Sequence, residues 1–254
     1  MTTAASREQF DAQAAKYAAS PVHKHGPSLP VLLEFAAPAP DDAALDVATG
    51  TGHTAFMLAP HVGRIVGVDV SAGMLAQARA QAERDNVPNI AFEEAAAENL
   101  PFPDAHFTLV TSRHAPHHFR DLAAFLAEAR RVLVPGGRLV IADQISPRAD
   151  LAEWVDTWQT TRDPSHYRQR TVEQWRGLTD AAGFAWEAEQ IVPYELDFAW
   201  WVQQSGCDAA ARADLQRQAA AVSPADREVL GLTFDAAGQV VRHLEPMLVV
   251  RLRR

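Results

Sequence analysis

The 254-residue chain has one cysteine, Cys207, no strongly basic segment and no long apolar run. A single cysteine excludes an intrachain disulfide framework and a zinc site built from several cysteines of this chain. Because 23 Lys and Arg stand against 32 Asp and Glu, a nucleic-acid groove or an anionic membrane surface is a poor fit. No run approaches the roughly 18 apolar residues of a membrane span, and the polar, mixed-charge residues 1–20 are unlike a secretion signal. These absences favour a cytoplasmic enzyme, monomeric or homodimeric, without nucleic-acid or membrane partners.

Hydrophobic periodicity predicts strands and helices that alternate along the first part of the chain. The expected strands are 43–47, 64–69, 90–94, 107–112 and 138–143, and the expected helices are 6–19, 29–35, 54–58, 72–84 and 122–133. This alternation indicates an α/β fold with a doubly wound, mostly parallel sheet. Later segments predict helices over 150–162, 172–182 and parts of 197–230, with strands over 184–193 and 245–251. No internal repeat or linker interrupts the chain, so a single domain is expected over 1–254.

The strongest local signal is the glycine-rich turn between the first strand and the helix that follows it. It reads Asp46-Val-Ala-Thr-Gly-Thr-Gly-His53. Glycine lets a ligand approach the backbone, and this turn lies at the carboxyl edge of a parallel sheet, where ligands bind. The second strand ends in Asp69, whose carboxylate can accept hydrogen bonds from both hydroxyls of a ribose. The pattern therefore predicts a nucleoside-containing cofactor.

A nicotinamide-dependent oxidoreductase is one alternative at this turn. Gly50-x-Gly52-x-x-Ala55 formally matches the dinucleotide fingerprint. However, Asp46 places a carboxylate where a pyrophosphate would lie, although a carboxylate suits an amino-acid ammonium group. No lysine follows the glycines to grip a phosphate, and Met74 can lie against a flat purine. These features favour a nucleoside bearing a cationic amino acid over a dinucleotide.

Four segments resemble, in the same order, the motifs of the class I S-adenosylmethionine-dependent methyltransferases. They are LDVATGTGHTA (45–55), VGVDVSAGMLAQARA (66–80), AAAENLPFPDAHFTLV (95–110) and EARRVLVPGGRLVIAD (128–143). The chain is most similar to the UbiE-like branch and, within it, to YcgJ-like bacterial methyltransferases, since SRHAPHHF (112–119) and TRDPSHYRQRTVEQW (161–175) extend the likeness. The resemblance implies a seven-stranded Rossmann-like methyltransferase fold with S-adenosylmethionine as cofactor and S-adenosylhomocysteine as product. It also implies a helical cap (1–40), a cofactor-binding core (41–145), and lid helices with the final strands (146–254).

The resemblance further implies where the cofactor lies. Ala48, Gly50 and Gly52 would line the methionine and ribose, Asp46 would lie near the ammonium group, and Asp69 would hold the ribose. Val70 and Met74 would pack on one side of the adenine, with Ala97 and Glu98 on the other. Ser112 and Arg113 would lie beneath the amino acid, and Tyr17 and His23 would close over its carboxylate. Two positions depart from the family. Ala48 replaces its first glycine, and Ala96 replaces an aspartate that often accepts the adenine amino group. A protein that binds the cofactor without methylating anything stays an alternative.

The histidines after the fourth strand are the candidates for catalysis. His117 and His118 suit a general base for a hydroxyl acceptor, because imidazole titrates near neutrality, although either could instead be structural. His114 with His117 or His118 has the spacing of a helical metal site, but no nearby carboxylate completes it, so no metal is expected. Candidates for contact with a small organic acceptor, methylated at oxygen or carbon, are His114, His166, Trp154, Trp158 and Trp201. Tryptophans at helical spacing could equally belong to the core.

Overall fold

The computed structural model describes residues 7, 10, 11, 14, 18 and 24–254. Most of the helix expected over 6–19, together with Tyr17 and His23, lies outside the described residues, so those predictions stay open. Among the described residues, no helix combines the length and apolarity needed to cross a membrane.

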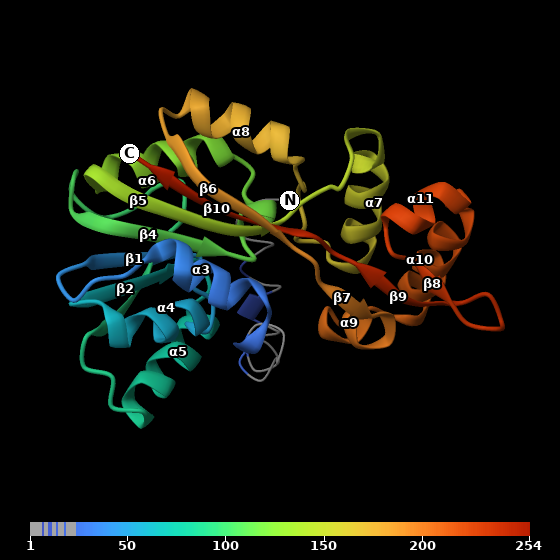
Figure 1. Cartoon of the computed structure of the whole chain (residues 1–254). Helices are drawn as coiled ribbons and strands as arrows, with labels where there is room; N and C mark the ends of the chain where they lie inside the picture. Colours follow the sequence, from blue (N-terminus) through green and yellow to red (C-terminus); the bar gives the residue numbers. More distant parts are fainter. Residues whose placement is uncertain (1–6, 8–9, 12–13, 15–17, 19–23) are drawn as a thin grey trace.

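A seven-stranded sheet forms the centre of the molecule (Figure 1). Its strands, in spatial order, are β3 (Ile90–Glu94), β2 (Arg64–Asp69), β1 (Ala43–Val47), β4 (Phe107–Arg113), β5 (Leu133–Gln144), β10 (Met247–Arg253) and β6 (Ala185–Val192). The first five run parallel, whereas β10 pairs antiparallel with both β5 and β6. Strand β1 is buried on both faces because helices cover both sides of the sheet. The predicted mostly parallel α/β fold is confirmed.

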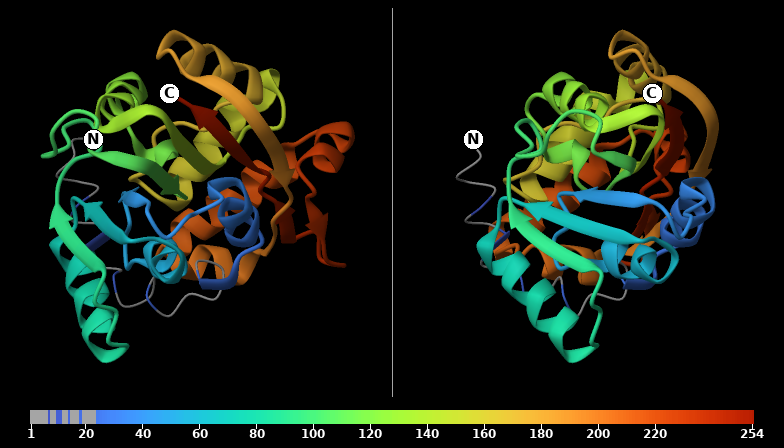
Figure 2. Two further views of the ribbon diagram at one scale, coloured as in Figure 1. Left: turned by 60° about the vertical axis from the view of Figure 1, so that its left-hand side comes forward. Right: turned by 90° about the vertical axis from the view of Figure 1, so that its left-hand side faces the viewer.

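Helices on the two faces bury separate apolar clusters against the sheet. Helices α3 (Ser28–Ala36) and α4 (His53–Leu58) contribute Leu32 and Leu58 to one cluster, whereas α6 (Leu122–Val132) and α8 (Val172–Ala181) contribute Phe125 and Trp175 to the other. Helix α5 (Ala72–Arg84) lies beside β3 at the sheet edge (Figure 2). Ser71, Asp121 and Thr171 cap α5, α6 and α8 with side-chain oxygens, which satisfies backbone amides of the first turn.

The end of the chain builds a lid beyond the carboxyl ends of the parallel strands (Figure 1). It consists of η3 (Ala149–Leu151), α7 (Ala152–Arg162), α9 (Phe198–Gln204), α10 (Ala209–Ala221), α11 (Pro224–Val229) and a three-stranded antiparallel sheet of β7 (Glu195–Asp197), β9 (Val240–Leu244) and β8 (Thr233–Phe234). The sequence patterns did not predict this small sheet. The last long strand begins at Met247, not at Glu245, and Glu245 and Pro246 form the link between β9 and β10.

Strand β5 begins at Leu133, five residues before the predicted start at Arg138. Leu133 pairs with Phe107, and the pairing resumes at Arg138 opposite Leu109, so the Pro-Gly-Gly segment 135–137 forms an irregularity within the strand. Gly136 accommodates this bend with φ of 76°. Two short 3-10 helices, η1 (Ala59–His61) and η2 (Pro116–His118), follow α4 and β4.

Candidate active site

A cavity of about 150 Å³ opens at the carboxyl ends of β1, β2 and β4. Its walls come from the turns after these strands, from the segment after β3 and from Phe10 of the N-terminal segment. Eight of the predicted cofactor residues border it, namely Ala48, Gly50, Asp69, Val70, Met74, Ala97, Glu98 and Arg113. Asp46, Gly52 and Ser112 are not among its described lining residues. Parallel strands thus bring together side chains that are far apart in the sequence, as expected of this sheet edge.

Asp69 is a buried carboxylate in the wall of the larger cavity. Its Oδ2 accepts a hydrogen bond from the Gly50 amide (2.8 Å), and its Oδ1 accepts one from the Ser71 amide (2.9 Å). Burial raises the pKa of Asp69, but these amide donors oppose that shift. The Val70 amide also lowers the pKa, and the carboxylate borders the cavity, where its oxygens can accept a hydrogen bond from a ligand.

The two glycines of the turn differ in function. Gly50 borders the cavity with φ of 55°, and a Cβ built there would meet no atom within 4 Å, so it would project into open space. At Gly52, with φ of 89°, a Cβ would lie 2.8 Å from the Phe56 ring. Gly50 therefore leaves a cradle that fits a ligand lying along the backbone, whereas Gly52 permits the turn and the packing beneath it.

Asp46 lies behind the cavity wall. Its carboxylate accepts hydrogen bonds from the hydroxyls of Thr49 and Thr111, both at 2.7 Å. Burial raises the pKa of Asp46 to about 6, although the two threonines and nearby Arg113 lower it. Asp46 thus reaches the cavity through Thr49, which borders it. Ser112 points to the opposite face of β4 from Thr111 and Arg113, as strand alternation requires, and its Oγ bonds to no described residue.

A second, smaller cavity of about 60 Å³ adjoins the first on the lid side. Phe10, His114 and His118 border both cavities. The remaining lining of the small cavity combines apolar side chains with charged and neutral polar ones and comprises His117, Gln144, Arg162, Asp163, Tyr194, Leu196, Trp200, Trp201, Glu245 and Met247. Of the three predicted tryptophans, only Trp201 is there. Trp158 stacks between Trp154 and Trp201 at centroid distances of 5.2 and 4.5 Å, which places it in the lid core.

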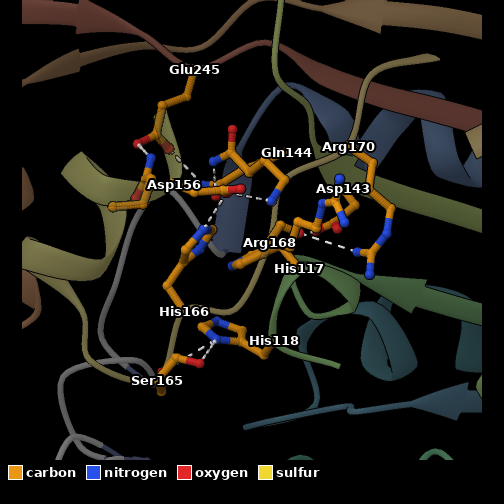
Figure 3. A network of polar contacts seen from close by, with 12 residues as sticks. His117, His118, Asp143, Gln144, Asp156, Ser165, His166, Arg168, Arg170 and Glu245 are labelled. Atoms are coloured by element: carbon orange, nitrogen blue, oxygen red, sulfur yellow. Dashed lines mark hydrogen bonds and ion pairs between the residues drawn. The ribbon is translucent and has the colours of Figure 1, made fainter. Parts of the chain in front are cut away.

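The histidines after β4 meet a polar network from β5, α7 and the loop 163–170 (Figure 3). Nδ1 of His117 lies 2.6 Å from Oδ1 of Asp143, and the amides of Tyr167 and Arg168 both donate to the His117 carbonyl oxygen. His166 is bound instead to Asp156, 2.9 Å from its Nε2, and borders neither cavity. These contacts fix the position of His117 in the wall of the smaller cavity, and His166 attaches the loop 163–170 to α7.

His118 occupies the junction of the two cavities. Its Nδ1 lies 3.1 Å from the carbonyl oxygen of Ser165 and 3.2 Å from the Ser165 Oγ, and Phe10 packs edge-on against its ring. The enclosed position and the neighbouring His117 lower the pKa of His118, so its imidazole is neutral at neutral pH. A neutral imidazole whose Nδ1 carries the proton leaves Nε2 with a free lone pair, which a general base requires.

His114 follows β4 with a left-handed backbone, φ of 53°, and its ring packs edge-on against Tyr194. Left-handed backbone at a non-glycine residue is concentrated at functional sites. Among the described residues, no three His, Cys, Asp or Glu side chains converge as metal ligands would.

Several residues of the two cavities did not emerge from the sequence patterns. They are Phe10, Arg120, Tyr194 and Glu245. Asp-Pro-Ser at 163–165 is a recognisable turn signal, but nothing in it shows that the turn faces a histidine 47 positions away. Phe10 has the helical spacing of an ordinary core residue, and that spacing conceals its place at the cavity junction.

Comparison with known proteins agrees with this geometry. Residues 45–141 match the model of a methyltransferase domain. The uncharacterized methyltransferase YcgJ of Bacillus subtilis is 29% identical over 247 residues, which cover 96% of this chain and 98% of that protein. Its crystal structure superposes with a TM-score of 0.88 over 91% of this chain and 99% of that chain, at 28% identity. The ubiquinone/menaquinone biosynthesis C-methyltransferase UbiE of Brucella anthropi is 31% identical over 172 residues, 66% of this chain and 64% of that protein.

These likenesses confirm the methyltransferase interpretation over the nicotinamide alternative. They cover the segment from Asp46 to Asp69, and the likeness to YcgJ also covers the lid. The open space at Gly50 and the Asp69 carboxylate in the cavity wall fit a nucleoside with an attached amino acid. The chain belongs to the S-adenosylmethionine-dependent methyltransferases related to YcgJ and UbiE.

Proposed function

We propose that this enzyme methylates a hydroxyl group of a small organic molecule that enters the smaller cavity. The observation that carries the proposal is the position of His118. Its imidazole borders both cavities, is neutral, and is held through Nδ1 by Ser165. A hydroxyl becomes a good nucleophile only when its proton is removed as the new bond forms, so a base at this junction is what O-methylation requires.

In this proposal, residues 41–145 bind the cofactor and residues 146–254 select the acceptor. Asp69 accepts the ribose hydroxyls, Val70 and Met74 pack against the adenine from one side, and Ala97 and Glu98 enclose it from the other. Ala48, Gly50 and Arg113 border the methionine portion, while Asp46 fixes Thr49 from behind. S-adenosylmethionine supplies a sulfonium methyl group that is already electrophilic, so the protein has to align the acceptor, exclude water and take one proton.

The lining of the smaller cavity constrains the acceptor. Asp163 and Glu245 are two carboxylates against the single guanidinium of Arg162, and His243, Arg162 and Gln159 lower the pKa of Glu245 although burial opposes this shift. Trp200, Trp201 and Tyr194 supply flat apolar surface. Such walls favour a neutral acceptor that has an apolar ring or chain and hydrogen-bond donors, and they repel an anionic one. No described basic patch lines this cavity for a nucleic-acid acceptor.

A carbon acceptor is the second candidate, because the UbiE relative is named a C-methyltransferase. The two candidates give different products. When the enzyme is incubated with cofactor labelled in the methyl group and a small-molecule extract, an O-methylated product contains a carbon–oxygen bond to the label, which NMR of the purified product identifies. A label attached to carbon would support the second candidate instead.

Cofactor binding is testable without the acceptor. Titration calorimetry with S-adenosylhomocysteine should show one site, and Asp69→Ala should weaken binding about a hundredfold or more, since two hydrogen bonds to a charged group are lost. Glu93→Gln is a matched control, since this acidic residue lies in the neighbouring strand β3 outside the lining of the cavity. Equal affinity in Asp69→Ala and wild type would contradict the proposed site, and label transfer that survives His118→Gln unchanged would contradict the base.

A further inference from the structure

The loop that follows α7 contacts the proposed base through one serine. Ser165 presents two oxygens to Nδ1 of His118, its carbonyl oxygen at 3.1 Å and its Oγ at 3.2 Å. A carbonyl oxygen only accepts hydrogen bonds, so it demands a proton on Nδ1. A hydroxyl can donate or accept, so Oγ could equally deliver its own proton to Nδ1 and favour the opposite tautomer.

Asp163 removes this ambiguity. Its Oδ1 accepts hydrogen bonds from both the Oγ (2.6 Å) and the backbone amide (2.9 Å) of Ser165. Because the hydroxyl proton points to Asp163, the Oγ lone pairs are left for His118. Asp163 is only 3% exposed; burial raises the pKa of its carboxyl, and nearby Arg162 and the two donors of Ser165 lower it. Both oxygens of Ser165 then act as acceptors toward the same imidazole nitrogen.

We propose that Asp163, acting through the Ser165 hydroxyl, is the positioning residue that fixes His118 in the tautomer with Nδ1 protonated and Nε2 free to accept the acceptor's proton. This inference rests on the proposed function, since His118 is the base only if the acceptor is deprotonated there. Asp163 touches the imidazole through Ser165 and not directly.

The surroundings of His118 show why a dedicated carboxylate is needed. The side chains that face it from η2 and the loop are His117 and His166, at centroid distances of 4.1 and 6.5 Å. Each of these two histidines already has its own carboxylate partner: Asp143 contacts His117, and Asp156 contacts His166. Asp163 is therefore the acidic group left to serve His118, and its charge also stabilises the imidazolium that forms when a proton is taken.

The test is the tautomer of His118, read by long-range proton–nitrogen NMR on full-length protein labelled with ¹⁵N-histidine and bound to S-adenosylhomocysteine at pH 7.5. His118→Gln assigns the signals by their disappearance. We expect wild type to show a protonated Nδ1 and a bare Nε2. Asp163→Ala should populate the opposite tautomer, because the freed Ser165 hydroxyl can then donate to Nδ1.

Two further variants separate a specific relay from general disruption. Asp163→Asn keeps an oxygen that accepts from Ser165, so it should preserve the wild-type tautomer. The double variant Asp163→Ala/Ser165→Ala also lacks the hydroxyl that could donate to Nδ1. Only the backbone carbonyl of residue 165 then faces Nδ1, so the wild-type tautomer should return. A simple loosening of the loop would not be rescued by removing a second side chain.

Calorimetry with S-adenosylhomocysteine on the same samples keeps the two proposals distinguishable. Absence of binding in wild type would overturn the proposed function. Normal binding with a proton on Nε2 of His118 in wild type would overturn this inference alone, and that measurement needs no variant to fold. An unchanged tautomer in a folded Asp163→Ala variant would overturn it as well.

Discussion

Ala48 holds a left-handed backbone, with φ of 56°, at the turn that borders the cofactor cavity. An alanine in this region is strained by about 1 kcal/mol relative to glycine, because its Cβ crowds the backbone carbonyl. The family's motif has glycine at this position, and the positive φ angle explains why an alanine there is strained. The turn tolerates the strain because Thr49 is fixed by Asp46 and by its amide bond to Val68.

Ala48→Gly should therefore raise the free energy of unfolding by about 0.5 to 1 kcal/mol, measured by urea denaturation. Part of the relieved strain is offset by the greater freedom of glycine in the unfolded chain. Gly50→Ala is the matched control, since φ is 55° and the new Cβ meets no neighbour, so it should destabilise by a similar amount. A less stable Ala48→Gly variant would refute this account of the turn.

Individual residues also show where sequence reasoning ends. Asp69 could be placed at the cavity from the sequence because strand ends in a parallel sheet share one edge. Asp46 lies in the preceding motif, but its carboxylate faces Thr49 and Thr111, and Thr111 is 65 positions away in the sequence. A motif thus predicts which turn borders the cavity, whereas tertiary neighbours decide which side chains of that turn face into it.

At the scale of elements, Asp11 connects the described part of the N-terminal segment to the start of α5. Asp11 accepts hydrogen bonds from the Ser71 hydroxyl (2.5 Å) and the Gly73 amide (2.9 Å), which lower its pKa. A negative charge at the start of a helix is also favoured by the helix dipole. The adjacent Phe10 borders both cavities and packs on His118, so the docking places an aromatic cover over the junction.

Asp11→Ala should weaken S-adenosylhomocysteine binding about fivefold, because roughly 1 kcal/mol of docking is lost, while the unfolding midpoint changes little. Arg7→Ala is the control from the same segment. It breaks an exposed ion pair with Glu94 (3.0 Å) and leaves both hydrogen bonds of Asp11 in place, so its affinity should stay within about twofold of wild type. Calorimetry decides this prediction, and wild-type affinity in Asp11→Ala would show that the segment does not cover the cofactor.

The elements that the sequence predicts well are those with local signals. The parallel strands are short apolar runs, and α6 has an apolar stripe behind an Asp121 cap, so each is recognisable alone. The small sheet has no such signal. Strand β8 has two residues, β7 has three, and the exposed positions of β9 interrupt its pattern. These strands exist because Glu195 pairs with Leu244 and Thr233 with Arg242, contacts between distant parts of the chain.

At the scale of the whole molecule, Glu245 joins the core sheet to the lid. Its carboxylate accepts hydrogen bonds from the side-chain amides of Gln144 in β5 and Gln159 in α7, both at 2.6 Å, and lies 3.3 Å from Nε2 of His243 in β9. Trp158 and Trp201 pack on the His243 ring, which continues the connection into the lid core. Because Glu245 also borders the smaller cavity, the same side chain connects the lid to the core sheet and shapes that cavity.

Glu245→Gln should lower the free energy of unfolding at pH 7.5 by about 3 kcal/mol or more. A glutamine offers one oxygen to three donors and turns its own amide hydrogens toward the others. Burial alone would raise the pKa of Glu245, but His243, Arg162 and Gln159 lower it to about 2. Its folded pKa therefore lies below the unfolded value, so its stabilising effect is present above about pH 4.5 and is lost as the pH falls toward 2.

The difference between Glu245→Gln and wild type should accordingly be largest at neutral pH and shrink below about pH 4, as measured by urea denaturation at several pH values. Glu195→Gln, in strand β7 of the small sheet, provides the control. Its ion pair with Arg242 is largely exposed, so its loss should change the free energy of unfolding by less than about 1 kcal/mol at any pH. If the two variants were equally stable at neutral pH, the lid would have to be held by its apolar contacts alone, and the carboxylate would act only in the cavity.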